Sequence, residues 1–369
     1  MPNYEYEVPL PGMYIQEELD ARGWSQRDLA FILGIEEPAL NKIVKGKTGI
    51  SIEMSKALAK AFEIDADFFA NLQKAYDFAR AGEPDPSVER RAALQRVYPV
   101  REMIKRNWIG ADNLEIQLAR FFKVANTNEI PHIAHAAKKT DSGSDVSPLQ
   151  HAWLCRVLQI AGQMPKTAYS EGALRKALPR LRALMAEPVE TRHVPRILME
   201  CGVKYVIVEG LSGGKIDGVC TWHEGRPIIG MSLRFDRIDN FWFVLRHEVE
   251  HVLRRHGQNA PIIDAEVMES AEDDLNSTQE KMANEAAMEF CVPRAEMSSF
   301  IARKAPFFSE RDVVGFARRM QVHPGIVVGQ IQAHTKKWDF LRKYLVKIRQ
   351  YLLPGAMVDG WGQVAPVSL

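Results

Sequence analysis

The pentapeptide HEVEH at residues 247–251 combines residue types and a spacing that suit metal chemistry. In a helix, His247 and His251 lie one turn apart on the same face, so both imidazoles can reach one ion. Glu248 stands beside them, where a glutamate can accept a proton from water. The apolar run at 241–245 predicts that this helix is buried. We therefore predict a Zn²⁺ site with Glu248 as the catalytic base, rather than a chance match on a charged helix.

A hydrolytic zinc site takes a third protein ligand. Glu280 is the preferred candidate, because it lies on a downstream helical segment with Asn284 one turn later, where an amide can hydrogen-bond a ligand. Two alternatives stay open. Glu285 is a rival ligand, and Glu280 also completes a capping box with Ser277, in which a glutamate only satisfies a helix N-terminus.

Two strands and several helices must position these residues. VKYVIVEG and RPIIGMSL are β-branched and bounded by glycines, which is typical of strands, and GLSGGKIDG between them is expected to be a turn or hairpin loop. RPIIGMSL is a candidate edge strand for an extended peptide, and His223 is a guess for the residue that stabilises an oxyanion. Helices are expected in the segments IDNFWFVLRHEVEHVLRRHG, TQEKMANEAAMEF and DFLRKYLVKIRQYLL (339–353).

The N-terminal part, residues 12–80, has the pattern of a series of short helices. Ser25 is a predicted N-cap before QRDLAFIL, Gly34 a predicted C-cap, and Ser51 the N-cap of a later helix. The stretch WSQRDLAFILGIEEPALNKIVKG follows the helix-turn-helix pattern, with one helix, a turn and a second helix that ends at a glycine.

The chain is expected to be α+β and mostly helical. GEPDPS (82–87) is a predicted linker, and a helical connector with LEIQLARFFKV and PLQHAWLCRVLQIAG follows it, interrupted by a polar loop at 136–148. Four parts are predicted, namely a helix-turn-helix domain at 1–81, the connector at 88–194, a domain with a small β-sheet and the HEVEH helix at 195–300, and a helical extension at 301–369.

The segment 195–295 resembles the ImmA/IrrE family of metallopeptidases. The resemblance rests on several elements that occur in order, namely Asp217–Gly218, Trp222, Pro227, Ile229, Asp239–Phe243, HEVEH, Glu280, Ala283–Asn284 and Pro293. It implies a zincin-like (gluzincin-like) domain in which His247, His251 and Glu280 hold zinc and Glu248 is the base. The chain departs from the family pattern at Met282 and Ala286, which bears on the pocket and the substrate rather than on the metal ligands.

The segment 10–80 resembles Xre-class antitoxins of the HigA type, through WSQRDLAFILG, GKTGIS and FFANLQKAYDFARA. The resemblance implies a lambda-repressor-like domain of five helices. By their positions around the second helix of the motif, the candidate DNA contacts are Gln26, Arg27, Glu37, Asn41, Lys42 and Lys45.

Charge is divided unevenly along the chain. The total is 48 basic and 47 acidic side chains, which excludes a protein that coats nucleic acid by charge alone. Residues 1–80 hold 9 basic and 13 acidic side chains, residues 81–200 hold 18 and 13, and residues 201–369 hold 21 and 21. The helix-turn-helix segment is thus acidic, whereas a DNA reader usually carries a basic surface. Dimerisation or protein recognition is therefore an alternative role for it.

Compartment and assembly follow from simpler features. The four cysteines are far apart, which argues against a disulfide framework, and the sequence has neither a signal peptide pattern nor a run of apolar residues long enough to span a membrane. We expect a cytoplasmic homodimer that does not bind membranes.

Three functions remain open. The chain is either a regulator that binds operator DNA, or a zinc endopeptidase that acts on a regulatory partner protein, or a non-catalytic antitoxin that binds a cognate toxin and represses its own operon. The intact HEVEH motif favours a metal and catalysis, and the HigA resemblance favours toxin–antitoxin or transcriptional control.

Overall fold

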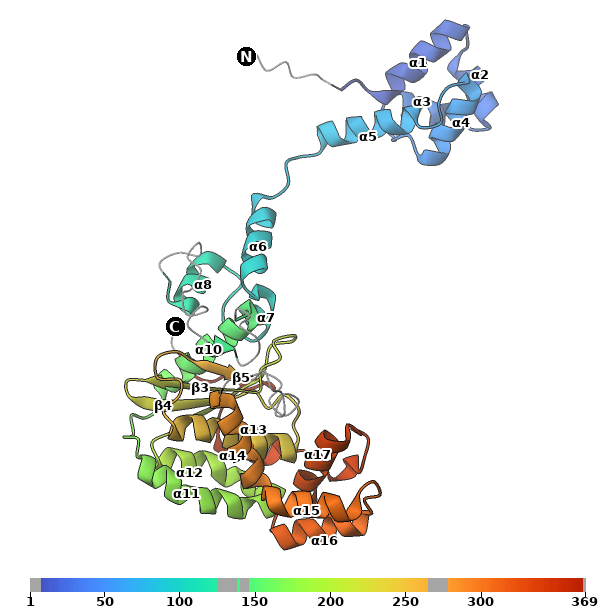
Figure 1. The fold of residues 1–369 in the computed structure, drawn as a ribbon. Helices are drawn as coiled ribbons and strands as arrows, with labels where there is room; N and C mark the ends of the chain where they lie inside the picture. The colour runs from blue at the N-terminus through green and yellow to red at the C-terminus, as the bar shows by residue number, and fades with distance from the viewer. Residues whose placement is uncertain (1–7, 125–137, 140–145, 265–277, 368–369) are drawn as a thin grey trace. The chain divides into compact units, whose positions relative to one another are not determined.

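The computed structural model describes residues 8–124, 138–139, 146–264 and 278–367. The chain separates into two compact units, residues 1–89 and 90–369 (Figure 1). The three parts that the sequence predicts after residue 88 thus belong to one compact unit. Among the described helices, none is both long enough and apolar enough to cross a lipid bilayer.

The first unit consists of five helices around a small apolar core. They are α1 (Pro11–Arg22), α2 (Gln26–Leu33), α3 (Glu37–Val44), α4 (Ile52–Phe62) and α5 (Phe68–Arg80). Local capping sets their ends as predicted, because the Ser25 and Ser51 side chains accept hydrogen bonds from the backbone N–H groups of Asp28 and Met54. Gly34 ends α2 in the left-handed conformation.

The second unit is built on one mixed sheet with the strand order β1-β5-β3-β4-β2-β6. The strands are β1 (Lys138–Lys139), β2 (Lys204–Val208), β3 (Gly218–His223), β4 (Arg226–Met231), β5 (Ile262–Asp264) and β6 (Met357–Asp359). β3 pairs antiparallel with β4 and β5, whereas β2 pairs parallel with β4 and β6.

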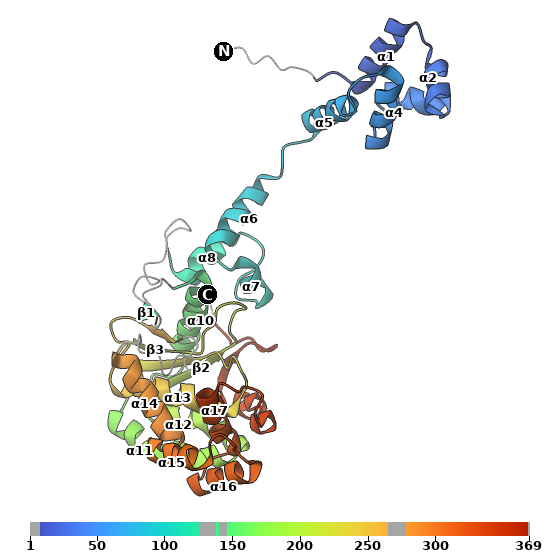
Figure 2. The same ribbon diagram turned by 45° about the vertical axis from the view of Figure 1, so that its right-hand side comes forward.

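Helices cover both faces of this sheet (Figures 1 and 2). On one face α10 (Pro148–Gln163) packs on β2, and Trp153 donates a hydrogen bond from Nε1 to the Val208 carbonyl at 2.8 Å. On the other face α13 (Ile238–Leu253) packs its apolar residues against Ile207 and Ile229. Next to α13 lies α14 (Thr278–Cys291).

Shorter helices complete the second unit. They are α6 (Pro86–Val97), which begins in the first unit, α7 (Val100–Lys105), α8 (Leu114–Phe122), α11 (Glu171–Ala183), α12 (Val194–Glu200), α15 (Arg294–Lys304), α16 (Glu310–Met320), α17 (Pro324–Thr335) and α18 (Arg349–Leu352), with four 3₁₀ turns. The described part of the chain is therefore mostly helical with a small mixed sheet, as the sequence predicts.

Two predictions about local structure need correction, and a third falls mostly outside the described residues. Segment 339–353 is no long helix, because it holds only a 3₁₀ turn and α18, and the N–H groups of Ile348 and Arg349 donate to Asp236 Oδ1 instead of to a helical carbonyl. GLSGGKIDG contains a turn, in which Gly214 N donates to the Leu211 carbonyl, but the alternative of a hairpin loop is wrong, because β2 and β4 run parallel and β3 is the hairpin partner of β4. The loop predicted at 136–148 lies mostly outside the described residues, although Lys138–Lys139 form β1.

A buried ion pair fixes β6 to α10. Arg156 donates to Asp359 Oδ2 from Nε at 3.0 Å, and Trp108 Nε1 donates to Asp359 Oδ1 at 2.8 Å. Both charged side chains are almost fully buried, at 3% and 1% exposure. Removing one partner of such a pair leaves the other charge buried and uncompensated, which is far more costly than losing an exposed pair.

We therefore expect Arg156→Met to lower the free energy of unfolding by about 3–5 kcal/mol. Urea denaturation measures this change. The matched control is Arg196→Met, which removes an exposed ion pair with Glu200 and should cost less than about 1 kcal/mol. Equal losses in the two variants would contradict a structural role for the buried pair.

Candidate metal centre and helix-turn-helix surface

Helix α13 brings His247 and His251 together at a buried site, as the sequence predicts. All of its residues from Ile238 to Leu253 are buried, and the two histidines are 1% and 0% exposed. Their Nε2 atoms are 3.0 Å apart, so both rings direct the same nitrogen toward one point. Four-residue spacing on a helix produces this convergence.

Two carboxylates complete the cluster. Glu280 on α14 approaches His247 Nε2 at 3.2 Å and His251 Nε2 at 3.5 Å. Asp264 at the end of β5 lies 3.4 Å from His247 Nε2 and 4.0 Å from His251 Nε2. One potential ligand atom from each of these four residues lies within 4.8 Å of all the others. Sequence spacing points to Glu280 but not to Asp264.

The donor set fits a tetrahedral divalent ion. Ligand atoms bonded at 2.0–2.2 Å to such an ion lie about 3.3–3.6 Å from one another. The separations of 3.0–3.5 Å among the two Nε2 atoms and the Glu280 oxygens are close to this range. Imidazole nitrogen and carboxylate oxygen are both ligands that Zn²⁺ accepts.

The outer nitrogens of both histidines have hydrogen-bond partners of their own. His247 Nδ1 lies 2.8 Å from Asn284 Oδ1, an acceptor, so Nδ1 donates its proton there and Nε2 is the nitrogen left to bind a metal ion once its own proton is displaced. His251 Nδ1 lies 2.9 Å from His256 Nδ1. The Asn284 contact agrees with its predicted role. No role beside the histidines was predicted for His256, which a turn after α13 folds back onto the site.

Buried negative charge dominates the electrostatics of the cluster. Burial raises the pKa of Glu248 well above its usual range, and Asp264, Glu280 and Asp217 raise it further. Burial by itself lowers the pKa of His247, but Asp264 and Glu280 outweigh that effect and raise it to about 10. The protein without an ion thus attracts protons to a site where a divalent cation would neutralise the same carboxylates.

Glu248 is fully buried and lies against the backbone of β3. A Cβ atom at Gly218 would clash with Glu248 Oε1, so only glycine leaves room for the carboxylate there. This close approach gives a physical reason for glycine at the first residue of β3.

Other predicted site features do not join the cluster. Glu285 is exposed on α14 and is not one of the residues that converge with the two histidines, whereas Glu280 is. His223 is exposed at the end of β3. The prediction of an edge strand at RPIIGMSL is wrong, because β4 is paired on both sides, by β3 and β2. The capping box cannot be followed, because Ser277 lies outside the described residues.

The predicted DNA contacts lie on α2 and α3, where they are linked to one another. Asn41 donates from Nδ2 to Gln26 Oε1 at 2.9 Å, and Gln26 donates from Nε2 to Gln16 Oε1 at 3.2 Å. Arg27 forms an exposed ion pair with Glu37 at 3.3 Å. The remaining candidates, Lys42 and Lys45, are exposed. The six residues predicted from the sequence are therefore all on one pair of helices or the turn that follows them.

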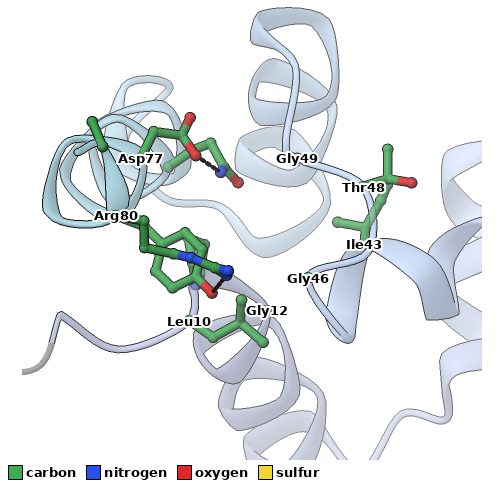
Figure 3. Close-up of a pocket in the computed structure, with 12 residues that line it drawn as sticks. Leu10, Gly12, Ile43, Gly46, Thr48, Gly49, Asp77 and Arg80 are labelled. Carbon is green, nitrogen blue, oxygen red and sulfur yellow. Dashed lines mark hydrogen bonds between the residues drawn. The ribbon is translucent and has the colours of Figure 1, made fainter.

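A hollow of about 510 Å³ lies beside the turn that follows α3 (Figure 3). It is bounded by the start of α1, the turn and α5. Gln73 on α5 accepts a hydrogen bond from Ile50 N at 2.9 Å and donates to Asp77 Oδ1 at 2.8 Å. Gln73 therefore links the segment after α3 to α5.

Comparisons with known proteins concern a fifth of the chain or less. The helix-turn-helix family model matches residues 15–69. Virulence-associated protein A' of Dichelobacter nodosus is 40% identical over 76 residues, which are 20% of this chain and 66% of that protein. The crystal structure of PA4674 from Pseudomonas aeruginosa with its operator DNA is 35% identical over 19% of this chain and 77% of that chain, with a TM-score of 0.19, too low to bear on the fold. Residues 15–69 thus form a helix-turn-helix domain, as predicted.

The contact between Gly218 and Glu248 can be tested by adding one methyl group. Gly218→Ala should lower the free energy of unfolding by about 1–3 kcal/mol, because either the strand or the carboxylate must move. Urea denaturation of the metal-free protein measures it. In the control, Gly210→Ala, the added Cβ meets Ser232 Cβ at an ordinary 3.6 Å. If Gly218→Ala were no more destabilising than Gly210→Ala, the close approach would be wrong.

Proposed function

We propose that the chain is a DNA-binding transcriptional regulator of the helix-turn-helix type whose second unit is a zinc-dependent endopeptidase of the ImmA/IrrE kind. The observation that carries the peptidase is the convergence of His247, His251 and Glu280 on one buried point with Glu248 next to them. The substrate would be a regulatory partner protein.

The residues of the cluster divide the work of hydrolysis. His247, His251 and Glu280 would hold the zinc ion, which supplies Lewis acidity toward a peptide carbonyl and lowers the pKa of water. Glu248 would accept a proton from the attacking water and return it to the leaving amine. Burial and the neighbouring carboxylates raise its pKa, which favours the protonated form that the second of these transfers needs. Asn284 and His256 would hold the imidazoles in place.

DNA recognition would use α3 and the start of α2. Asn41 donates a hydrogen bond to Gln26. In this arrangement Asn41 is suited to read the edge of an adenine, and Gln26 is suited to brace a DNA phosphate or base. Lys42 and Lys45 are exposed and available for phosphates. A homodimer would place two such helices on two half-sites.

A non-catalytic antitoxin is the second candidate function. It is favoured by the excess of acidic side chains in residues 1–80, which hold 9 basic and 13 acidic ones. The ion pair between Arg27 and Glu37 further reduces the positive charge that the helix-turn-helix surface offers to DNA. In that case the metal site would stabilise a scaffold, and Glu248→Gln would leave every cellular effect unchanged.

The zinc site predicts different results for neighbouring glutamates on α14. Purified wild-type protein should hold about one zinc ion per chain, and Glu280→Gln should lower the zinc affinity by a factor of about 10–100 or more. Glu285→Gln is the matched control on the same helix and should bind zinc like the wild type. Zinc content by mass spectrometry and competition with a chelator give both values. Equal affinities in the two variants would remove Glu280 from the ligand set.

Catalysis is tested separately from metal binding by Glu248→Gln. This variant should keep its zinc but hydrolyse a fluorescence-quenched peptide library at least about 100-fold more slowly than the wild type, because it lacks the base. Undiminished hydrolysis by Glu248→Gln would exclude the proposed mechanism.

DNA reading is tested on duplexes that the wild-type protein selects from a random pool. Asn41→Ala should weaken binding to the selected duplex by a factor of about 5–150, equivalent to one lost base contact of about 1–3 kcal/mol. Lys74→Ala on α5 is the control and should bind within about twofold of the wild type. Gel shifts measure both. If no duplex were enriched, or if Asn41→Ala bound equally well, α3 would not be a base-reading helix.

A further inference from the structure

Asp264 is a buried carboxylate at the metal centre that the proposed peptidase mechanism does not use. It ends β5, is 0% exposed, and lies 3.4 Å from His247 Nε2 through Oδ2. Its role there, argued next, rests on the proposed zinc site.

The backbone holds Asp264 firmly in position. β5 pairs antiparallel with β3, with Asp264 opposite Gly218, and Asp217 N donates a hydrogen bond to the Asp264 carbonyl at 2.8 Å. Residues directly opposite each other on paired strands point to the same face of the sheet, and the Gly218 position faces Glu248. The register therefore turns the Asp264 side chain toward α13. Its approach to the histidines is a product of the sheet and not of a surface loop.

Asp264 faces the wrong nitrogens to serve as an orienting partner. A carboxylate that orients a ligand histidine accepts a proton from the nitrogen that does not bind the metal. Here both Nδ1 atoms already have partners, Asn284 for His247 and His256 for His251. Asp264 instead lies by the two Nε2 atoms, which converge on the same point as the Glu280 oxygens. That is the position of a ligand.

A fourth protein ligand changes what the centre can do. Structural zinc sites are closed by four protein ligands, whereas hydrolytic sites keep one position for water or substrate. We propose that Asp264 is a fourth protein ligand and holds the metal in a closed, latent site, which acts on a peptide only when the Asp264 carboxylate has left the ion. The endopeptidase is therefore regulated at its own metal.

Cobalt(II) replaces zinc as a probe that is visible by absorption. Asp264→Asn should bind cobalt at least tenfold more weakly than the wild type, because one anionic ligand is lost. The matched control is Asp217→Asn, which removes a neighbouring buried carboxylate outside the proposed ligand set and should bind cobalt within about threefold of the wild type. Asp264→Ala serves as a second variant, and urea denaturation of the metal-free proteins shows that each is folded.

Access to the metal is measured with acetohydroxamate, a small bidentate ligand. The spectrum of cobalt-loaded Asp264→Asn should shift at acetohydroxamate concentrations at least tenfold lower than those that shift the wild-type spectrum. Equal cobalt affinity, or equal acetohydroxamate affinity, in the wild type and both Asp264 variants would overturn the proposal. A wild-type protein that binds no cobalt or zinc would instead overturn the proposed function itself.

Discussion

The arrangement of the second unit depends on one electrostatic constraint, which is that several carboxylates and imidazoles share a dry interior. Glu248, Asp264 and Glu280 are each at most 3% exposed, and they surround two equally buried histidines. Burying uncompensated negative charge is costly unless the groups take up protons or coordinate a cation. The raised pKa values of His247 and Glu248 are the response of the metal-free cluster to this cost. A divalent ion would neutralise the same buried carboxylates. The sheet, α13 and α14 together bring its ligands to one point.

Features set by local sequence could be predicted well. The helix-turn-helix domain follows from caps at Ser25 and Ser51 and from apolar spacing, all of which act within a few residues. The convergence of His247 and His251 follows from helical geometry alone. The Asn284 contact was also predictable once Glu280 was placed on a helix, because the two lie one turn apart on the buried face of α14.

Features set by long-range pairing could not be predicted. Asp264 reaches the metal centre only because β5 pairs with β3, and a lone aspartate after two isoleucines carries no local sign of that register. The interior position of β4 likewise depends on the parallel pairing of β2, which lies before β3 in the sequence. Segment 339–353 looks helical by its apolar spacing, yet Asp236 takes the N–H groups of Ile348 and Arg349. Tertiary hydrogen bonds outweighed helix propensity there.

The function proposed for the second unit therefore depends on one ion at one place. Crystals of protein purified without chelators, measured on both sides of the zinc absorption edge, test this most directly. We expect a single anomalous peak per chain within about 2.0–2.2 Å of His247 Nε2, His251 Nε2 and a Glu280 oxygen. No peak at this cluster, after growth and purification with added zinc, would contradict it.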